Sequence, residues 1–168
     1  IFQTYLLPNN HKSIDIRIEQ LTNAIKMVYC SVFSNIARSY IKAVNYRIED
    51  EKMAIVIQEV VGNQFGDYFY PHISGVAQSY NYYPYAHMKP DEGIAVAAVG
   101  LGKFVVDGEN AYRISPRYPN IQNSTTTEMY KNSQLNFYAV DLKSKDIALD
   151  SGEMAGLRKL DIDIAEMH

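Results

Sequence analysis

This sequence has a single cysteine, no cluster of histidines and no net positive charge, and each of these absences excludes a class of protein. Cys30 is the single cysteine, so an internal disulfide framework is excluded. The four histidines are scattered without the spacing of zinc ligands. The formal net charge of −3 gives no broad basic field, so nucleic acid is a poor candidate partner. No apolar run approaches the roughly 20 residues that cross a bilayer, so no membrane partner is expected.

The composition is that of a soluble globular protein. The chain has 168 residues, of which 47% are hydrophobic and 21% charged. A chain of this length buries roughly two-thirds of its extended surface, enough for a core in one domain or in two small subdomains. It begins at Ile1 without an initiator methionine or a signal sequence. We therefore expect a piece of a larger, cytoplasmic protein.

Two helices are predicted in the first third of the chain. From Ile14 to about Ser31, apolar residues recur at spacings of three and four, the pattern of one buried helical face. Cys30 falls on the side expected to be buried. Ser34 is suited to cap a second helix, because its side chain can accept from free backbone N–H groups. The side chains expected to point inward near that helix are Phe33, Ile36, Ala37 and Tyr40.

Strand signals follow the helices. The β-branched run Met53-Ala-Ile-Val-Ile-Gln-Glu-Val-Val61 predicts a buried strand, and Asn63 to Tyr70 is interpreted as a loop. A short helix is expected at Lys103 to Val106, and Thr125 with Glu128 has the spacing of a capping box. Further strands are expected at Ile73 to Ser79, Ile94 to Val99, Ala111 to Ser115 and Phe137 to Leu142. Two helices, then strands, then a mixed tail predict an α+β fold.

The turn Gly100-Leu-Gly102-Lys103 is the most suggestive local feature. Glycines allow backbone N–H groups to approach an anion closely, and a neighbouring lysine can hold a phosphate oxygen. The spacing is neither that of a Walker loop nor that of the dinucleotide fingerprint. A tight strand-to-helix turn without a ligand is the alternative interpretation.

Two other groups of polar side chains have alternative interpretations. Gln58 and Glu59 interrupt an apolar strand, so they either face a cleft that holds an adenine or mark a solvated strand end. The favoured interpretation of the tyrosine-rich loop is that its rings pack it onto the body of the protein. These tyrosines are Tyr80, Tyr82, Tyr83 and Tyr85. A stacking platform for a sugar or a base is the other possibility.

Four motifs in order resemble the N-terminal region of the phosphoenolpyruvate synthase and pyruvate phosphate dikinase family. The resemblance covers roughly Ile14 to Pro119 and implies an ATP-grasp-like subdomain with helices packed on a mainly antiparallel sheet. It divides the chain into a partial nucleotide-binding region at 1–119 and a mixed α/β extension of the same domain at 120–168. The motifs are Ile25-Lys-Met-Val-Tyr-Cys-Ser-Val-Phe33, Met53 to Val61, Ile73-Ser-Gly-Val-Ala77 and Gly100-Leu-Gly-Lys-Phe-Val-Val-Asp-Gly108.

The resemblance also implies a function and a site. The parent protein would bind Mg-ATP and pass a phosphoryl group through a phosphohistidine on another domain to pyruvate, with water or phosphate as the second acceptor. Residues implied to hold the adenine are Gln58, Glu59 and Val61. Residues implied to lie at the turn beside the triphosphate are Gly100, Gly102 and Lys103, and Arg113 is a further candidate for binding the nucleotide. Candidate Mg²⁺ ligands are Asp107 and Glu109.

Several positions depart from the family pattern. Val96 stands where the family has a metal-binding carboxylate, Lys103 where the turn has a glutamate, and Ile41 where a helix ends in arginine. The family's other phosphate segments, its phosphohistidine domain and its pyruvate barrel correspond to no part of this chain. Because phosphoryl transfer needs many positioned groups, we expect no independent activity and only millimolar or no ATP binding by the chain alone.

Two rival functions remain at this point. The departures at Ile41, Val96 and Lys103 suit a degenerate nucleotide-binding module that regulates its parent. The tyrosines between Tyr80 and Tyr85 suit a module that binds a sugar or a peptide. Whether the parent is a synthase or a dikinase is left open.

Overall fold

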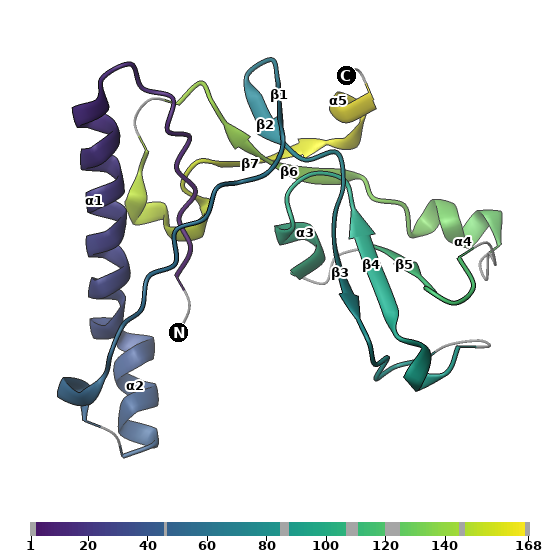
Figure 1. The fold of residues 1–168 in the computed structure, drawn as a ribbon, viewed down its shortest axis with the longest axis horizontal. Helices are drawn as coiled ribbons and strands as arrows, with labels where there is room; N and C mark the ends of the chain where they lie inside the picture. Colours follow the sequence, from purple (N-terminus) through teal and green to yellow (C-terminus); the bar gives the residue numbers. More distant parts are fainter. Residues whose placement is uncertain are drawn as a thin grey trace. The chain divides into compact units, whose positions relative to one another are not determined.

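The computed structural model confirms the α+β class, with helices first and antiparallel strand pairs after them (Figure 1). It describes residues 3–45, 47–84, 88–106, 111–119, 125–144 and 147–166. The chain divides into two compact units. The first contains Ile1–Val60 and Val140–Arg158, and the second contains Val61–Ala139 and Lys159–His168. The division at 119/120 that the resemblance implied remains a prediction.

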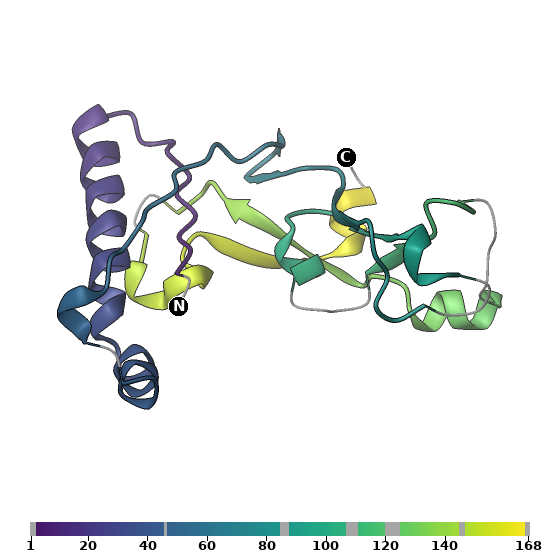
Figure 2. The ribbon, with the colours of Figure 1, turned by 60° about the horizontal axis from the view of Figure 1, so that its bottom comes forward.

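The first unit contains the two predicted helices. Helix α1 (Ile14–Cys30) continues into the 3₁₀ turn η1 (Ser31–Phe33), after which α2 (Asn35–Ala43) begins. The chain changes direction between α1 and α2, as Figure 2 shows. The Ser34 hydroxyl accepts from the Ala37 N–H at 3.2 Å, which confirms the predicted cap. Two 3₁₀ segments, η2 (Ile48–Asp50) and η4 (Leu149–Met154), also belong to this unit.

The predicted burial of the helical faces is confirmed only in part, because Leu21, Ile25 and Val28 of α1 are half-buried whereas most apolar side chains near α2 are exposed. Phe33, Ile36 and Tyr40 are exposed, with Ile36 at 76%, and Cys30 is exposed too. Ala24 is the buried residue of α1, and Ala37, which was expected to point inward, is that of α2. An apolar stripe is buried only where another element covers it. The main described contacts of α1 are with the short 3₁₀ segments η1 and η4, and those of α2 are with η1.

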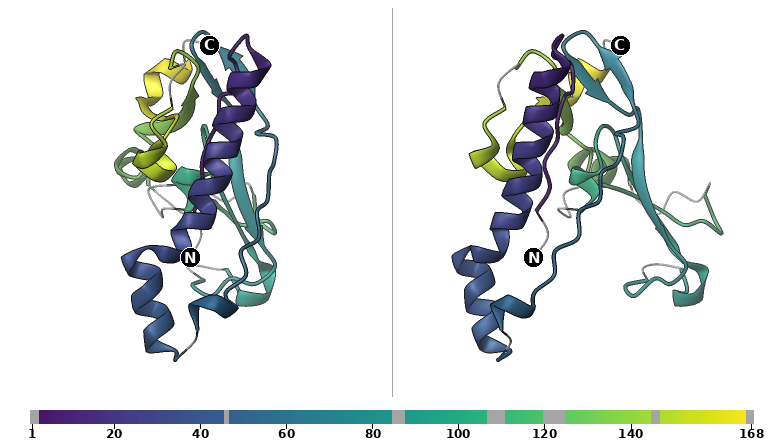
Figure 3. Two further views of the ribbon diagram at one scale, coloured as in Figure 1. Left: turned by 90° about the vertical axis from the view of Figure 1, so that its left-hand side faces the viewer. Right: turned by 60° about the vertical axis from the view of Figure 1, so that its left-hand side comes forward.

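The predicted strand from Met53 to Val61 does not form. The segment runs as irregular chain up to strand β1, as Figure 3 shows. Its apolar side chains are exposed: Val56 at 78%, Ile57 at 65% and Val61 at 82%. A strand requires a neighbour for its backbone N–H and C=O groups. No strand of the described residues pairs with this segment, so its β propensity has no sheet to join.

The second unit contains a three-stranded sheet that matches the prediction closely. Its strands are β3 (Ser74–Gln78), β4 (Ile94–Ala98) and β5 (Tyr112–Ile114), in the order β3-β4-β5. Both strand pairs are antiparallel. The 3₁₀ turn η3 (Pro90–Glu92) precedes β4. Helix α3 (Lys103–Val106) has the predicted bounds and contacts β3 and β4.

A hairpin occupies the segment interpreted as a loop. Strands β1 (Asn63–Phe65) and β2 (Tyr68–Tyr70) pair antiparallel, with Phe65 opposite Tyr68. Gly66 has a φ of +58°, and Gly66-Asp67 forms the two-residue connection. Glycine followed by aspartate favours such a turn, but three-residue strands are too short to show alternation in the sequence.

The hairpin belongs to a four-stranded sheet in the order β1-β2-β6-β7. Strands β6 (Asn136–Asp141) and β7 (Leu157–Asp161) and helix α5 (Ile162–Glu166) confirm the strand and mixed-tail predictions. Helix α4 (Thr126–Lys131) opens with the predicted capping box, because Thr125 and Glu128 bond each other's backbone N–H.

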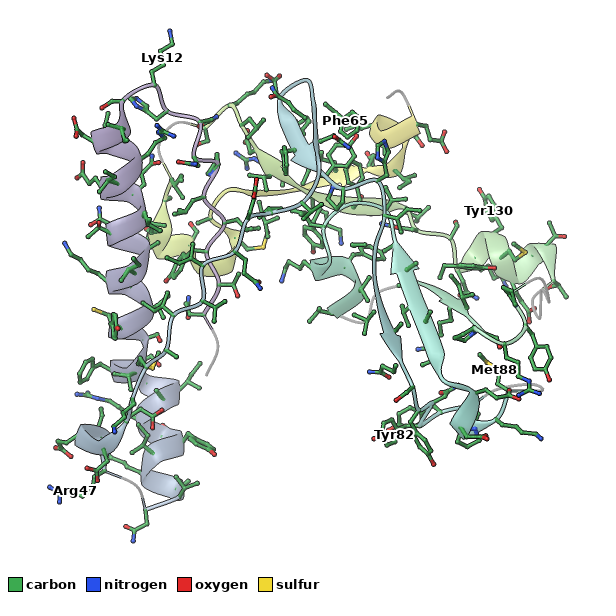
Figure 4. All side chains as sticks on the ribbon, in the orientation of Figure 1. Lys12, Arg47, Phe65, Tyr82, Met88 and Tyr130 are labelled. Carbon is green, nitrogen blue, oxygen red and sulfur yellow. The ribbon has the colours of Figure 1, made fainter. Side chains whose placement is uncertain are left out.

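The main core of the second unit lies around Tyr70 and Phe137. These two side chains and Ala139 are fully or nearly fully buried, and the two ring centroids are 4.8 Å apart. Phe65, labelled in Figure 4, packs against Tyr70 with its ring centroid at 4.6 Å. Residues of α5 also pack on this cluster. Burial of these aromatic rings supplies much of the apolar contribution to the stability of the second unit.

Candidate functional site

The glycine turn after β4 is anchored tightly to strand β6. Gly100 has a φ of +82°, a conformation that L side chains rarely adopt. A Cβ at this position would lie 2.7 Å from both the Phe137 ring and the Tyr138 carbonyl oxygen. The Leu101 N–H donates to that same carbonyl at 2.8 Å, and Leu101 is buried. Glycine at position 100 therefore serves to bring the turn against β6.

Gln134 fixes the residue that enters the turn. The Val99 N–H donates to Gln134 Oε1 at 2.8 Å, and Gln134 Nε2 donates to the Val99 carbonyl at 3.0 Å. The same Nε2 donates to the Asn136 carbonyl at 2.8 Å. A side-chain amide thus satisfies a backbone donor and acceptor as a neighbouring strand would. This support holds the turn in one place before any ligand arrives.

Gly102 differs from Gly100 in having space around it. The nearest atom to a Cβ at position 102 would be Ser74 Oγ, at 4.0 Å. The Gly102 N–H donates to no acceptor within the described residues, and the buried Ser74 hydroxyl has no partner there either. Unused donors beside an open glycine are what an anion needs for a close approach to the backbone.

Lys103 begins helix α3, and its ammonium group lies over the Tyr138 ring. Its Nζ is 5.8 Å from the ring centroid. Lys159, on β7, places its own Nζ 5.6 Å from the centroid of the same ring. Both distances are in the cation–π range. The ring of Tyr138, whose carbonyl oxygen anchors the turn, therefore has two ammonium groups near it.

The predicted adenine residues belong to a different compact unit from most of the predicted phosphate residues. Gln58 and Glu59 are exposed and lie in the first unit, in the irregular segment described above. Val61 is exposed at the start of the second unit. Their convergence with the glycine turn on one nucleotide remains a prediction. Arg113 is exposed on β5, directly opposite Val96 of β4.

The described residues do not offer a divalent-cation site. The predicted metal ligands Asp107 and Glu109 lie outside the described residues. Elsewhere in the described chain, no three His, Cys, Asp or Glu side chains come together as metal ligands would. Mg²⁺ requires oxygen ligands, and positions 96 and 103 present an isopropyl group and an ammonium group instead.

The tyrosine loop does not pack its rings inward, so the favoured interpretation of this loop is wrong. Tyr80, Tyr82 and Tyr83 are exposed, while Tyr85 lies outside the described residues. Asn81 is buried and anchors the loop, because its N–H donates to the Pro90 carbonyl at 2.7 Å and its Oδ1 accepts from the Tyr83 N–H. Tyr80 and Tyr82 pack edge to face, with ring centroids 4.9 Å apart. The anchored backbone leaves three aromatic rings facing solvent.

A pocket of about 260 Å³ lies on the core side of the second unit. Consecutive residues of a strand point to opposite faces of the sheet. Phe137 therefore faces the core, whereas Tyr138 faces Lys103 and Lys159 on the other side of the sheet. The Tyr70 hydroxyl is buried and has no hydrogen-bond partner among the residues that the structure describes, and burial raises the pKa of Tyr70. Residues that line the pocket are Phe65, Tyr70, His72, Val99, Ile162, Ala165 and Glu166.

Sequence reasoning found the glycine turn and Lys103 but missed the residues that support them. Gln134, Tyr138 and Lys159 follow the turn by 31 to 56 positions in the chain, and no local motif joins them to it. Tyr138 sits in the correctly predicted strand β6, but pairing between distant strands decides what its ring meets. Only the fold brings these side chains to the turn.

Comparisons with known proteins agree with the resemblance. The family model described as "Pyruvate phosphate dikinase, AMP/ATP-binding domain" matches residues 2–165. No curated protein and no solved structure matches the chain significantly. None of the helices in the described part of the chain has the length and apolar character required to span a membrane. Because the family model matches nearly the whole sequence, the chain belongs to the family of pyruvate phosphate dikinase AMP/ATP-binding domains.

Proposed function

We propose that this domain binds ATP for a phosphotransferase that acts on pyruvate through a phosphohistidine intermediate on another domain. The single observation that carries the proposal is the family match over residues 2–165. The glycine turn adds physical support, because a buried and anchored Gly100 holds the open Gly102 and the Lys103 ammonium in place. Water or phosphate would be the second phosphoryl acceptor.

The residues divide into two groups with separate roles in this proposal. Gln58, Glu59 and Val61 would offer backbone and side-chain groups to the adenine. The Gly102 N–H and the Lys103 ammonium would hold phosphate oxygens, with Arg113 as a further cation. Such groups stabilise charge on a transferring phosphoryl group without taking part in covalent chemistry.

Magnesium has a restricted place in the proposal. When bound, Mg²⁺ would neutralise phosphate charge, with Asp107 and Glu109 as candidate ligands besides the phosphates themselves. The described turn carries the Lys103 ammonium group and no carboxylate, so the roles given above to the chain's residues do not include holding the metal.

Isothermal titration with ATP tests nucleotide binding directly. We expect millimolar affinity for ATP, weakened in Lys103→Met, whose side chain keeps its length but loses the charge. Lys131→Met, which removes an exposed lysine of α4, is the matched control and should bind as the wild type does. Equal affinity of the wild type and Lys103→Met for ATP would contradict the role given to the glycine turn.

Turnover by the whole parent protein separates an enzyme from a regulatory module. We expect ATP consumption that depends on pyruvate. Binding without turnover would leave a degenerate, regulatory nucleotide module as the function of this family member.

A second candidate function is supported by the exposed tyrosines. Tyr80, Tyr82 and Tyr83 face solvent on a loop that Asn81 anchors, so they can stack on a sugar or a base. Quenching of tyrosine fluorescence by a panel of oligosaccharides, compared with Tyr82→Ala, tests it. Quenching that is unchanged in the variant would exclude this loop as the binding surface.

A further inference from the structure

The pocket on the core side of the second unit has no role in the proposed function. Its volume is about 260 Å³, and its walls come from β1, β2 and α5 together with Val99, which precedes the glycine turn. All of these residues belong to the second compact unit. The pocket is therefore a feature of one unit and of one core.

Aromatic rings form one wall of the pocket. The Phe65 ring packs against Tyr70 with the centroids 4.6 Å apart, and the His72 imidazole meets Phe65 edge to face at 5.2 Å. The Tyr70 ring also packs on the fully buried Phe137, so the core holds this wall in place. Aromatic rings interact with a further ring beyond the gain from buried area alone, because their faces are negative and their edges positive.

Aliphatic side chains complete the lining. Val99, Ile162 and Ala165 are half-buried, and their side chains carry no polar atoms. The Val99 N–H and carbonyl are already bonded to the Gln134 side-chain amide. These residues can therefore stabilise a ligand by apolar contact but give it little to hydrogen-bond.

The polar groups of the lining do not suit an anion. Tyr70 is 2% exposed, and burial raises its pKa, so its hydroxyl stays protonated and uncharged at neutral pH. His72 and Glu166 are exposed and mark the solvent side of the pocket. Among the described lining residues, Glu166 is the one with a full formal charge, and a carboxylate repels a negatively charged ligand.

The volume limits the size of the ligand. An apolar cavity of about 150 Å³ accommodates benzene, so this pocket admits one aromatic ring with a short substituent. Pockets that bind drug-sized ligands usually have volumes of about 300–1,000 Å³. A whole nucleotide such as ATP therefore exceeds what the pocket can enclose.

We propose that this pocket binds a small aromatic molecule without negative charge, whose ring packs against Phe65 and His72. The site is separate from the residues proposed above to hold the nucleotide. Phe137 and Tyr138, which are consecutive in β6, place the pocket and Lys103 on opposite sides of the sheet. The proposal therefore does not depend on the proposed function.

Titration of the chain with benzyl alcohol tests the site, with NMR signals of the Val99 and Ile162 methyl groups as the readout. Two matched probes are cyclohexylmethanol, which has a similar size without the aromatic ring, and benzoate, which has the ring and a negative charge. We expect millimolar binding of benzyl alcohol and about fivefold weaker binding of either matched probe. Equal binding of the three probes would overturn the proposed ligand class.

Two variants locate the binding in the pocket. Ala165→Leu fills the pocket from α5 and should abolish binding, whereas Ala43→Leu, the same change at an exposed position of α2, should leave it unchanged. Unaltered signals from β3, β4 and β5 show that the Ala165→Leu variant is folded. Phe65→Leu adds no volume to the core and should reduce the preference for benzyl alcohol over cyclohexylmethanol.

Three outcomes would overturn the proposal. They are benzyl alcohol binding by a folded Ala165→Leu variant as tight as that of the wild type, an unchanged preference in Phe65→Leu, and methyl signals that do not shift with benzyl alcohol. Saturating ATP should not displace benzyl alcohol. Displacement would show that the pocket belongs to the nucleotide site, whereas benzyl alcohol binding by a chain that does not bind ATP supports the pocket and leaves the nucleotide function unsupported.

Discussion

The two compact units differ in how their apolar residues are used. In the first unit, α1 and α2 form where the periodicity predicts, yet Ile14, Ile18 and Ile36 remain exposed. In the second, short strands and the five-residue helix α5 pack around the fully buried Phe137. Periodicity predicts whether an element forms, but burial requires a partner that covers it. The unit with the better core also holds the glycine turn and Lys103.

Removing the Phe137 ring should have the largest effect on stability. Phe137 is 0% exposed and packs on Tyr70, so Phe137→Ala leaves a cavity in the core. We expect a loss of about 3–5 kcal/mol in the free energy of unfolding, measured by urea denaturation. A loss below about 1 kcal/mol would show that the second unit is not packed around this side chain.

The two glycines of the turn offer a matched comparison. Gly100→Ala forces a Cβ to within 2.7 Å of β6 atoms at a φ of +82°, so we expect a loss of about 2–3 kcal/mol. Gly102→Ala meets nothing closer than 4.0 Å and should change stability little. Thermal unfolding of the two variants checks the difference. Equal effects would contradict the separate roles given to the two glycines.

Asp141 should make stability depend on acid pH. Its buried carboxylate accepts from Arg158 Nε at 2.8 Å and from the Lys143 N–H at 2.8 Å. Burial opposes ionisation, but these hydrogen bonds prevail and hold the pKa of Asp141 below its usual value. Its contribution is complete above the pKa of the unfolded chain and is lost as pH falls through the lower folded value.

Asp141→Asn should therefore cost about 1–2 kcal/mol at neutral pH. The difference from the wild type should shrink as pH falls below about 4. Urea denaturation at several pH values measures both effects. A difference that is constant from neutral to acid pH would contradict the role given to this carboxylate.

Tyr70→Phe should be neutral or slightly stabilising. The Tyr70 hydroxyl is buried with no hydrogen-bond partner in the described residues, so its removal relieves a desolvation cost of up to about 1 kcal/mol. Urea denaturation of Tyr70→Phe beside the wild type provides the measurement. A clear loss of stability would show that the hydroxyl has a partner in solution.

Ile36→Ser should have the smallest effect of all. Ile36 is 76% exposed on α2, and surface substitutions of this kind change the unfolding free energy by less than about 0.5 kcal/mol. The comparison with Phe137→Ala tests the difference between the units directly. A loss of several kcal/mol would show that the face of α2 is covered in solution.

The sequence predicted elements better than it predicted their environments. Ser34 and Thr125 mark helix starts through local hydrogen bonds, so both caps could be read from neighbouring residues. The run from Met53 to Val61 has the composition of a strand, but a strand also depends on a distant partner, which local sequence does not encode.

The residues of the candidate site also fall into those that a local motif identifies and those that only the fold brings together. The glycine turn and Lys103 form a contiguous motif, whereas Gln134 and Lys159 reach it through strand pairing. Asp107 and Glu109 lie outside the described residues, so their assignment remains a prediction. Local motifs therefore identify where a ligand meets the backbone, and the fold decides which other side chains join it.

The most direct test of the account is amide chemical-shift mapping of the whole chain during an ATP titration. The account predicts the largest changes at Gly102, Lys103 and Tyr138, with no change on the exposed face of α2. Changes confined to other parts of the chain, with the glycine turn unaffected at saturating ATP, would contradict it.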